Sequence, residues 1–134
     1  MPGLDAKPPF SVLVIEDEQL VRESIADMLA LEGLPCLVAE DGAAGLAALA
    51  GHLGDVRVVV LDLTMPGMSG EATFRGLRSL DPRLRILITS GIDESVARER
   101  FASEPIAGYL QKPYPLPTLV RVVRNLLGSS PAAG

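Results

Sequence analysis

The stretch VVVLDLTMPGMSG, residues 58–70, places an aspartate directly after a run of apolar residues. The run is β-branched and almost continuously apolar, which is typical of a strand that is buried on both faces of a sheet. We expect this strand over Val56–Leu61, with Asp62 as the first residue beyond its carboxyl end. Similar apolar runs occur in the chain on both sides of this stretch.

Short apolar runs alternate with segments of helical periodicity along the rest of the chain. The other runs, each expected to form a strand, are Ser11–Ile15, Pro35–Ala39, Arg85–Thr89 and Gly108–Gln111. Helices are expected over Gln19–Glu32, from Asp41-Gly42 through Leu53, after Ser69-Gly70, over Glu94–Phe101 and from about Pro117. Five strands that alternate with five helices predict an α/β fold, with one doubly wound parallel sheet covered on both faces.

Length and composition bound the organisation of the chain. The 134 residues, of which 48% are hydrophobic, fit one domain with a sizeable core. Proline and glycine near the beginning, and a Gly-Ser-Ser-Pro-Ala-Ala-Gly run at the end, indicate tails. We therefore expect one domain over 11–127, between tails at 1–10 and 128–134.

Charge, cysteine content and hydropathy argue against several classes of protein. The net charge of −5 argues against a nucleic-acid-binding surface. Cys36 is the only cysteine, so no intrachain disulfide can form, which suits a reducing cytosol. No apolar run approaches the ~18 residues that span a bilayer, and residues 1–9 lack the pattern of a signal peptide. These features favour a cytoplasmic protein that binds neither nucleic acid nor membrane.

The expected strand ends gather acidic, hydroxyl and ammonium groups, and in parallel α/β sheets this edge is where ligands bind. The strand ends run into Glu16-Asp17-Glu18, Asp62, Thr89-Ser90-Gly91 and Gln111-Lys112-Pro113. Two carboxylates ~4 Å apart repel by about 4 kcal/mol at an effective dielectric constant of ~20, unless a proton or a cation lies between them. Carboxylate oxygens with no histidine or cysteine nearby favour Mg²⁺ over zinc.

This combination of residue types points to phosphoryl chemistry. A bound Mg²⁺ can neutralise phosphoryl oxygens while Asp62 attacks phosphorus as a nucleophile. Lys112 can pair with the same oxygens, and the Ser90 hydroxyl can donate a hydrogen bond to one of them.

Over roughly Ser11–Leu127 the sequence resembles the receiver domains of two-component signalling. That family has an acidic pair after the first strand, a phosphorylated aspartate after the third, a Thr or Ser after the fourth and Lys-Pro after the fifth. Here Ser90 lies 28 residues after Asp62, and Lys112 lies 22 residues after Ser90, which are ordinary spacings for the family. The resemblance implies a flavodoxin-like sheet with strand order 2-1-3-4-5 and five helices on its two faces.

The resemblance also implies a role for each residue of the cluster. Asp62 matches the phosphoacceptor and Asp17 the direct Mg²⁺ ligand. Glu16 matches the acid that reaches the metal through water, and the backbone carbonyl of Thr64 matches a further ligand. Glu16 stands where the family often has aspartate, so its longer side chain is expected to alter the metal geometry slightly.

Further residues match the part of the family pattern that carries the signal. Ser90 and Tyr109 resemble the switch pair, in which the hydroxyl moves toward the phosphoryl group and the ring turns inward. Lys112-Pro113 resembles the family's cis peptide bond. Thr64 and Ile92 would flank the path of the water that removes the phosphoryl group, and because Ile92 cannot orient a water, slow dephosphorylation is expected. Thr89 is the alternative to Ser90 as the switch hydroxyl.

The resemblance implies partners as well as chemistry. A histidine kinase or a histidine phosphotransfer protein would supply the phosphoryl group, and a downstream protein would read the switch, with phosphorylation-dependent dimerisation as one readout. A free-standing receiver and a receiver of a larger regulator or hybrid kinase both fit the sequence.

Three other functions share parts of this pattern. An aspartate-nucleophile phosphatase requires a second aspartate two residues after the first, where this chain has Thr64. A flavodoxin-like protein that binds FMN requires a Ser/Thr/Gly-rich loop after the first strand, where this chain has Glu16-Asp17-Glu18. A degenerate receiver that acts only as an interaction module is disfavoured by the intact Asp62 and Lys112. A signalling receiver, not an enzyme, is therefore the favoured interpretation.

Overall fold

A computed structural model describes residues 10–65, 67–104 and 106–128 and contains a single five-stranded sheet. Its strands are β1 (Val12–Ile15), β2 (Cys36–Ala39), β3 (Val58–Asp62), β4 (Arg85–Ser90) and β5 (Gly108–Gln111). They lie in the order β2-β1-β3-β4-β5, and every neighbouring pair is parallel. The expected doubly wound sheet and its strand order are confirmed.

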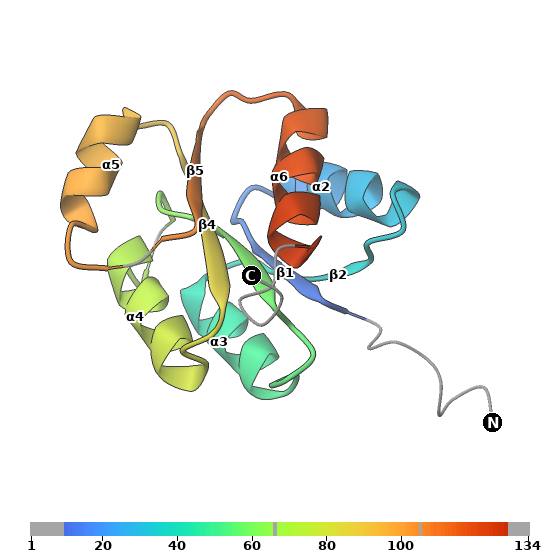
Figure 1. Cartoon of the computed structure of the whole chain (residues 1–134), viewed down its shortest axis with the longest axis horizontal. Coiled ribbons are helices and arrows are strands. Elements are labelled where there is room, and N and C mark those ends of the chain that lie inside the picture. Colours follow the sequence, from blue (N-terminus) through green and yellow to red (C-terminus); the bar gives the residue numbers. More distant parts are fainter. Residues whose placement is uncertain (1–9, 66, 105, 129–134) are drawn as a thin grey trace.

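Five helices cover the two faces of this sheet, as predicted (Figure 1). They are α2 (Gln19–Leu31), α3 (Gly42–Ala50), α4 (Gly70–Leu80), α5 (Glu94–Arg100) and α6 (Leu116–Gly128). Helices α2 and α6 lie on one face, and α3, α4 and α5 lie on the other (Figure 1). No helix of the described ranges is both long and apolar enough to cross a membrane.

The alternation of side chains along each strand divides the core into two apolar clusters. In β1, Leu13 and Ile15 pack toward α3, α4 and α5, whereas Val12 and Val14 pack toward α2 and α6. The strands β3 and β4 divide their side chains in the same way. All four of these β1 residues have an exposed fraction of 0%, so the strand is buried on both faces, as its continuous apolar character predicts.

Some boundaries differ from the expected ones. Strands β3 and β4 each continue one residue further than predicted, so Asp62 and Ser90 are the last residues of their strands. Helix α3 ends at Ala50, and Leu53 lies beyond it with half of its surface exposed. The helical spacing of Leu53 is therefore accidental, and Gly54, at φ +89°, turns the chain there. Helix α6 runs to Gly128, the first residue of the predicted tail. The rest of both tails, apart from Phe10, falls outside the described residues.

The loop after β3 is shaped by close packing at Gly70. A Cβ atom on Gly70 would lie 2.8 Å from the Cα atom of Leu63, so the backbone of α4 approaches the end of β3 closely. Ser69 caps the helix, because its hydroxyl accepts a hydrogen bond from the Ala72 N–H at 3.0 Å. Gly67 adopts φ +83°, which most other residues would resist. These three residues account for the Gly-Met-Ser-Gly part of the stretch that begins with β3.

Candidate functional site

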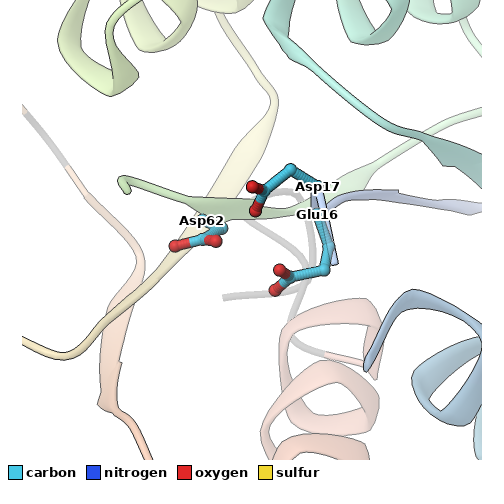
Figure 2. A group of neighbouring side chains, drawn as sticks. All are labelled: Glu16, Asp17 and Asp62. Carbon is cyan, nitrogen blue, oxygen red and sulfur yellow. The ribbon is translucent and has the colours of Figure 1, made fainter. Parts of the chain in front are cut away.

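Three carboxylates meet at the carboxyl edge of the sheet. Glu16 and Asp17 follow β1, and Asp62 ends the neighbouring strand β3. One oxygen from each of the three lies within 4.8 Å of the others (Figure 2). Glu16 and Asp62 each expose only 2% of their surface. The structure therefore brings together the acidic residues that the sequence predicted would converge.

Lys112 supplies the positive charge of this cluster. Its ammonium nitrogen lies 2.9 Å from Oε1 of Glu16 and 3.2 Å from Oδ2 of Asp62. Desolvation alone would lower the pKa of Lys112, but the hydrogen bond to Glu16 and the charges of Asp62 and Glu16 outweigh it and raise the pKa. Lys112 therefore stays charged and bridges the two buried carboxylates.

The surroundings of Glu16 strongly perturb its carboxyl group. Burial raises its pKa to about 6, and the negative charge of Asp62 acts in the same direction. The hydrogen bonds from Lys112 and from the Glu18 N–H act in the opposite direction but are too weak to cancel the effect of burial. A divalent cation beside Glu16 would favour its ionised form.

The donor set of this cluster fits a hard divalent cation. Three carboxylates face one ammonium, so with all four groups ionised the cluster keeps two excess negative charges. All three candidate ligand atoms are carboxylate oxygens, which suit Mg²⁺ better than zinc. Thr64 lies against the cluster, because its N–H donates to Oδ1 of Asp62 at 3.0 Å.

A second group of residues lies at the same edge of the sheet but on the opposite face. Ser90 follows Ile86 and Ile88 on the face of β4 that packs toward α3, α4 and α5. Its hydroxyl accepts a hydrogen bond from the Ile92 N–H at 3.2 Å and lies 3.3 Å from the hydroxyl of Thr64. Thr64 therefore connects Ser90 to Asp62 through two hydrogen bonds.

The same contacts separate Ser90 from its alternative, Thr89. Thr89 is paired with Asp62 in the sheet register and shares the face of Leu87, which packs toward α2 and α6. The Thr89 hydroxyl is buried and makes no hydrogen bond within the described part of the chain. Ser90, not Thr89, is the hydroxyl linked to Thr64.

Tyr109 is turned inward and held close to Ser90. It exposes 8% of its surface and packs in the cluster under α3, α4 and α5. Its hydroxyl donates to the carbonyl oxygen of Ile92 and lies 3.3 Å from the carbonyl oxygen of Ser90. The side chain of Ile92 packs, half-buried, against the same cluster. The Lys112–Pro113 peptide bond is cis, as the resemblance implied.

Two names follow from this division of the edge. The charged side comprises Glu16, Asp62 and Lys112, which continue the face toward α2 and α6. The hydroxyl side comprises Ser90 and Tyr109, on the face toward α3, α4 and α5.

Arg22 is a site residue that the sequence did not reveal. Its guanidinium group reaches back from α2 and donates to the carbonyl oxygens of Glu16 and Asp17, at 2.9 and 3.3 Å. These contacts hold the backbone of the acidic loop and bring a positive charge beside it. Any residue supplies a backbone carbonyl, so the sequence does not show which carbonyls accept a hydrogen bond from an arginine. The one hint in the sequence is that a cation stands one turn into the helix that follows the acidic residues.

Comparisons with known proteins agree with this fold and define its family. The family model of the response regulator receiver domain matches residues 12–124. The chain therefore belongs to the response regulator receiver domain family of two-component systems. Among solved structures, a receiver domain protein from Clostridium thermocellum superposes with a TM-score of 0.81 at 25% identity, covering 89% of this chain and 94% of that one. The chemotaxis protein CheY4 of Vibrio cholerae shares the fold, with a TM-score of 0.80 at 23% identity, over 90% and 99% of the two chains.

Curated relatives contain this domain as part of longer proteins. The response regulator MprA of Mycobacterium sp. (strain KMS) is 35% identical over 119 residues, which cover 89% of this chain and 51% of MprA. The sensor kinase CckA of Brucella abortus is 31% identical over 123 residues, which cover 92% of this chain and 13% of CckA. The chain thus spans about half the length of the curated response regulators that it matches, and a much smaller part of the kinase.

Proposed function

We propose that this receiver accepts a phosphoryl group on Asp62, with Mg²⁺ bound by the acidic cluster, and changes conformation in response. The observation that carries the proposal is the buried Asp62 carboxylate, which shares Lys112 with Glu16 and lies within 4.8 Å of Glu16 and Asp17. This arrangement combines a nucleophile, a cation site and an ammonium group within one cluster. Asp17 and Asp62 would bind the metal directly, Glu16 through water, and the Thr64 carbonyl would complete the protein ligands.

The transfer step uses groups of this cluster and a phosphohistidine donor, together with a bound metal ion. An Asp62 oxygen attacks phosphorus, a P–O bond forms, and the P–N bond to the donor imidazole breaks, with the electron pair leaving on nitrogen. Mg²⁺ would supply charge neutralisation at the phosphoryl oxygens. Lys112 pairs with one of these oxygens and so holds the group against Asp62.

The response would begin on the hydroxyl side. A phosphoryl oxygen on Asp62 competes for the hydroxyl groups of Thr64 and Ser90, which lie 3.3 Å apart. If Ser90 turns to that oxygen, the hydrogen bond from the Ile92 N–H is lost, and the Ile92 carbonyl that accepts from the Tyr109 hydroxyl would shift. Because the Tyr109 ring is already inward, the response would change the partners of its hydroxyl and would not need the inward turn that the resemblance implied. The output of the site would therefore appear around the ends of β4 and β5.

The partners follow from the chemistry and from the proteins that contain related domains. A histidine kinase or a histidine phosphotransfer protein would donate the phosphoryl group, and a downstream protein would read the changed surface. The name sensor kinase for one relative and response regulator for another supports both contexts, a domain of a hybrid kinase and a domain of a regulator. In either context we propose a cytoplasmic switch without an enzymatic product of its own.

Mass spectrometry after treatment with acetyl phosphate tests the proposal. With millimolar Mg²⁺ the protein should gain the mass of one phosphoryl group, located on Asp62 after digestion, and without Mg²⁺ it should gain little. Asp62→Asn should gain nothing, because an amide is not a competent nucleophile. Asp27→Asn, an exposed aspartate on α2, is the matched control and should label like wild type. Labelling of Asp62→Asn to the wild-type level would overturn the proposal.

A further inference from the structure

Tyr114, two residues after Lys112, is a half-buried residue whose hydroxyl the proposed chemistry does not use. Its hydroxyl oxygen is buried and has no hydrogen-bond partner among the described residues. A buried hydroxyl without a partner costs about 1–3 kcal/mol of stability. A phenylalanine would fill almost the same space without that penalty. The hydroxyl therefore points to a partner that becomes available in another state of the protein.

The fold brings Tyr114 to the layer from which the charged side projects. Its ring packs against the apolar cluster that contains Val12 and Val14 of β1. Glu16 continues the same face of the chain, because side chains alternate and the Glu16 N–H still bonds to Ala39 as in the ladder, at 3.0 Å. The aromatic ring and the Glu16 carboxylate thus belong to the same layer of the molecule.

The electrostatic surroundings of Tyr114 agree with this placement. Burial raises its pKa to about 12, and the charges that act on it are those of Lys112, Glu16 and Asp62. These are the three residues of the charged side. The phenol is neutral at every ordinary pH and carries one O–H donor.

Phosphorylation would change which acceptors of this layer are satisfied. In the structure, Lys112 donates to Glu16 and to Asp62, at 2.9 and 3.2 Å. A phosphoryl group on Asp62 adds oxygens that carry more charge than a carboxylate and attract the ammonium group more strongly. When Lys112 turns to those oxygens, Oε1 of Glu16 loses its donor in a buried position, which is costly unless another donor replaces it.

We propose that Tyr114 is a positioning residue for phosphoryl transfer, whose buried hydroxyl donates to the Glu16 carboxylate when Lys112 turns to the phosphoryl group. The inference rests on the proposed function, because phosphorylation is what moves Lys112. Tyr114 would hold Glu16 in place for the metal and would lower the penalty for releasing Lys112. The Tyr114 hydroxyl would thus lack a partner in the unphosphorylated protein and gain one, the Glu16 carboxylate, in the phosphorylated protein.

Tyr114→Phe tests the inference, with Tyr109→Phe as the matched control. The Tyr109 hydroxyl already has a carbonyl partner, so its removal should lower the melting temperature of the unphosphorylated protein. Tyr114→Phe should leave that melting temperature unchanged or raise it. The same variant should bind beryllofluoride with Mg²⁺, a phosphoryl mimic, about tenfold more weakly than wild type, as measured by calorimetry.

A double-mutant cycle with Glu16→Met, which removes both carboxylate acceptors but keeps the length of the side chain, separates a positioning role from a general packing role. If Tyr114 acts through the Glu16 carboxylate, Tyr114→Phe should weaken beryllofluoride binding by no more than about twofold when residue 16 can no longer accept a hydrogen bond, as in Glu16→Met. If Tyr114→Phe bound beryllofluoride with wild-type affinity, or lost affinity tenfold both with and without the substitution at residue 16, the inference would be overturned. The proposed function would still stand. Absence of both beryllofluoride binding and phosphorylation in the wild-type protein would overturn the proposed function and this inference with it.

Discussion

The charged side and the hydroxyl side occupy the same edge of one sheet but are held together by different forces. On the charged side, Glu16 and Asp62 are buried carboxylates that share one ammonium group. On the hydroxyl side, Ser90 and Tyr109 form neutral hydrogen bonds with the backbone of Ile92. Charges in a buried site respond strongly to an added cation or phosphoryl group, whereas neutral hydrogen bonds of about 1 kcal/mol are easily exchanged. The difference suits the first side to the proposed chemistry and the second to the proposed response.

Thr64 is the point where the two sides meet. Its N–H donates to Asp62 at 3.0 Å, and its hydroxyl lies 3.3 Å from that of Ser90. The loop that carries Thr64 is fixed by the close approach of Gly70 to Leu63. Two hydrogen bonds therefore link Asp62 to Ser90, and they are the proposed route by which a change at Asp62 would reach Ser90.

Removal of the Lys112 ammonium group should break the charged side most severely. Lys112→Ala leaves two buried carboxylates without their shared partner, so the free energy of unfolding in Mg²⁺-free buffer should fall by about 3 kcal/mol. Urea denaturation measures this loss, and added Mg²⁺ should restore part of it. Arg83→Ala, which removes an exposed cation, should change stability by less than about 0.5 kcal/mol. Equal effects of the two substitutions would show that Lys112 does not compensate the carboxylates.

The pH dependence of stability should show the burial of Glu16. Its pKa is about 6 in the folded protein and 4.5 without perturbation, so the folded state holds this proton more tightly. The resulting stabilisation is fully present below pH 4.5, is lost as the pH rises through 6, and amounts to about 2 kcal/mol. Denaturation of wild type and Glu16→Gln between pH 4 and 7, without Mg²⁺, should show this loss only in wild type. Parallel curves for the two proteins would remove Glu16 as the source.

Mg²⁺ should stabilise the unphosphorylated protein by mass action. At a concentration tenfold above its dissociation constant, one bound ion adds about 1.4 kcal/mol. Asp17→Ala removes one of the three candidate ligands, so the rise in melting temperature with Mg²⁺ should shrink to less than half of the wild-type rise. Asp27→Ala, on the exposed surface of α2, should keep the full rise. A full rise in Asp17→Ala would exclude Asp17 from the metal site.

The smallest expected effect concerns the lifetime of the phosphorylated state. Ile92 offers no group that orients a water, and its branched side chain would shield the phosphoryl group. Ile92→Asn should therefore lose its phosphoryl group severalfold faster than wild type once the donor is removed. Val96→Asn, at an exposed position on α5, is the control and should decay at the wild-type rate. Decay of wild type as fast as Ile92→Asn would show that Ile92 does not guard the site.

The sequence predicts the sheet and the charged side well because both depend on residue type and order. Buried parallel strands require continuous apolar runs, and the strand Gly108–Gln111 is found with its predicted bounds. The carboxyl ends of such strands converge, so Glu16, Asp62 and Lys112 could be expected to meet before any geometry was known. The same argument placed Asp17 beside them.

The features that the sequence did not reveal depend on contacts that residue type does not encode. Arg22 acts on backbone carbonyls, and any residue supplies those. The missing partner of the Tyr114 hydroxyl is visible only when its surroundings are known. The end of α3 at Ala50 differs from the predicted end, because Leu53 has helical spacing by chance while the chain turns at Gly54.

The amide chemical shift of Tyr109 on addition of Mg²⁺ and beryllofluoride tests most directly whether chemistry on the charged side is read on the hydroxyl side. This chemical shift is compared in wild type and Ser90→Ala. The amide signal of Thr64, whose N–H donates to the Asp62 carboxylate, reports when beryllofluoride has saturated Asp62. Both proteins should bind the mimic, since Ser90 is not part of the charged side. The Tyr109 signal should move in wild type and stay near its unbound position in Ser90→Ala. The same Tyr109 displacement in both proteins would contradict the account, because the response would then reach β5 without the Ser90 hydroxyl.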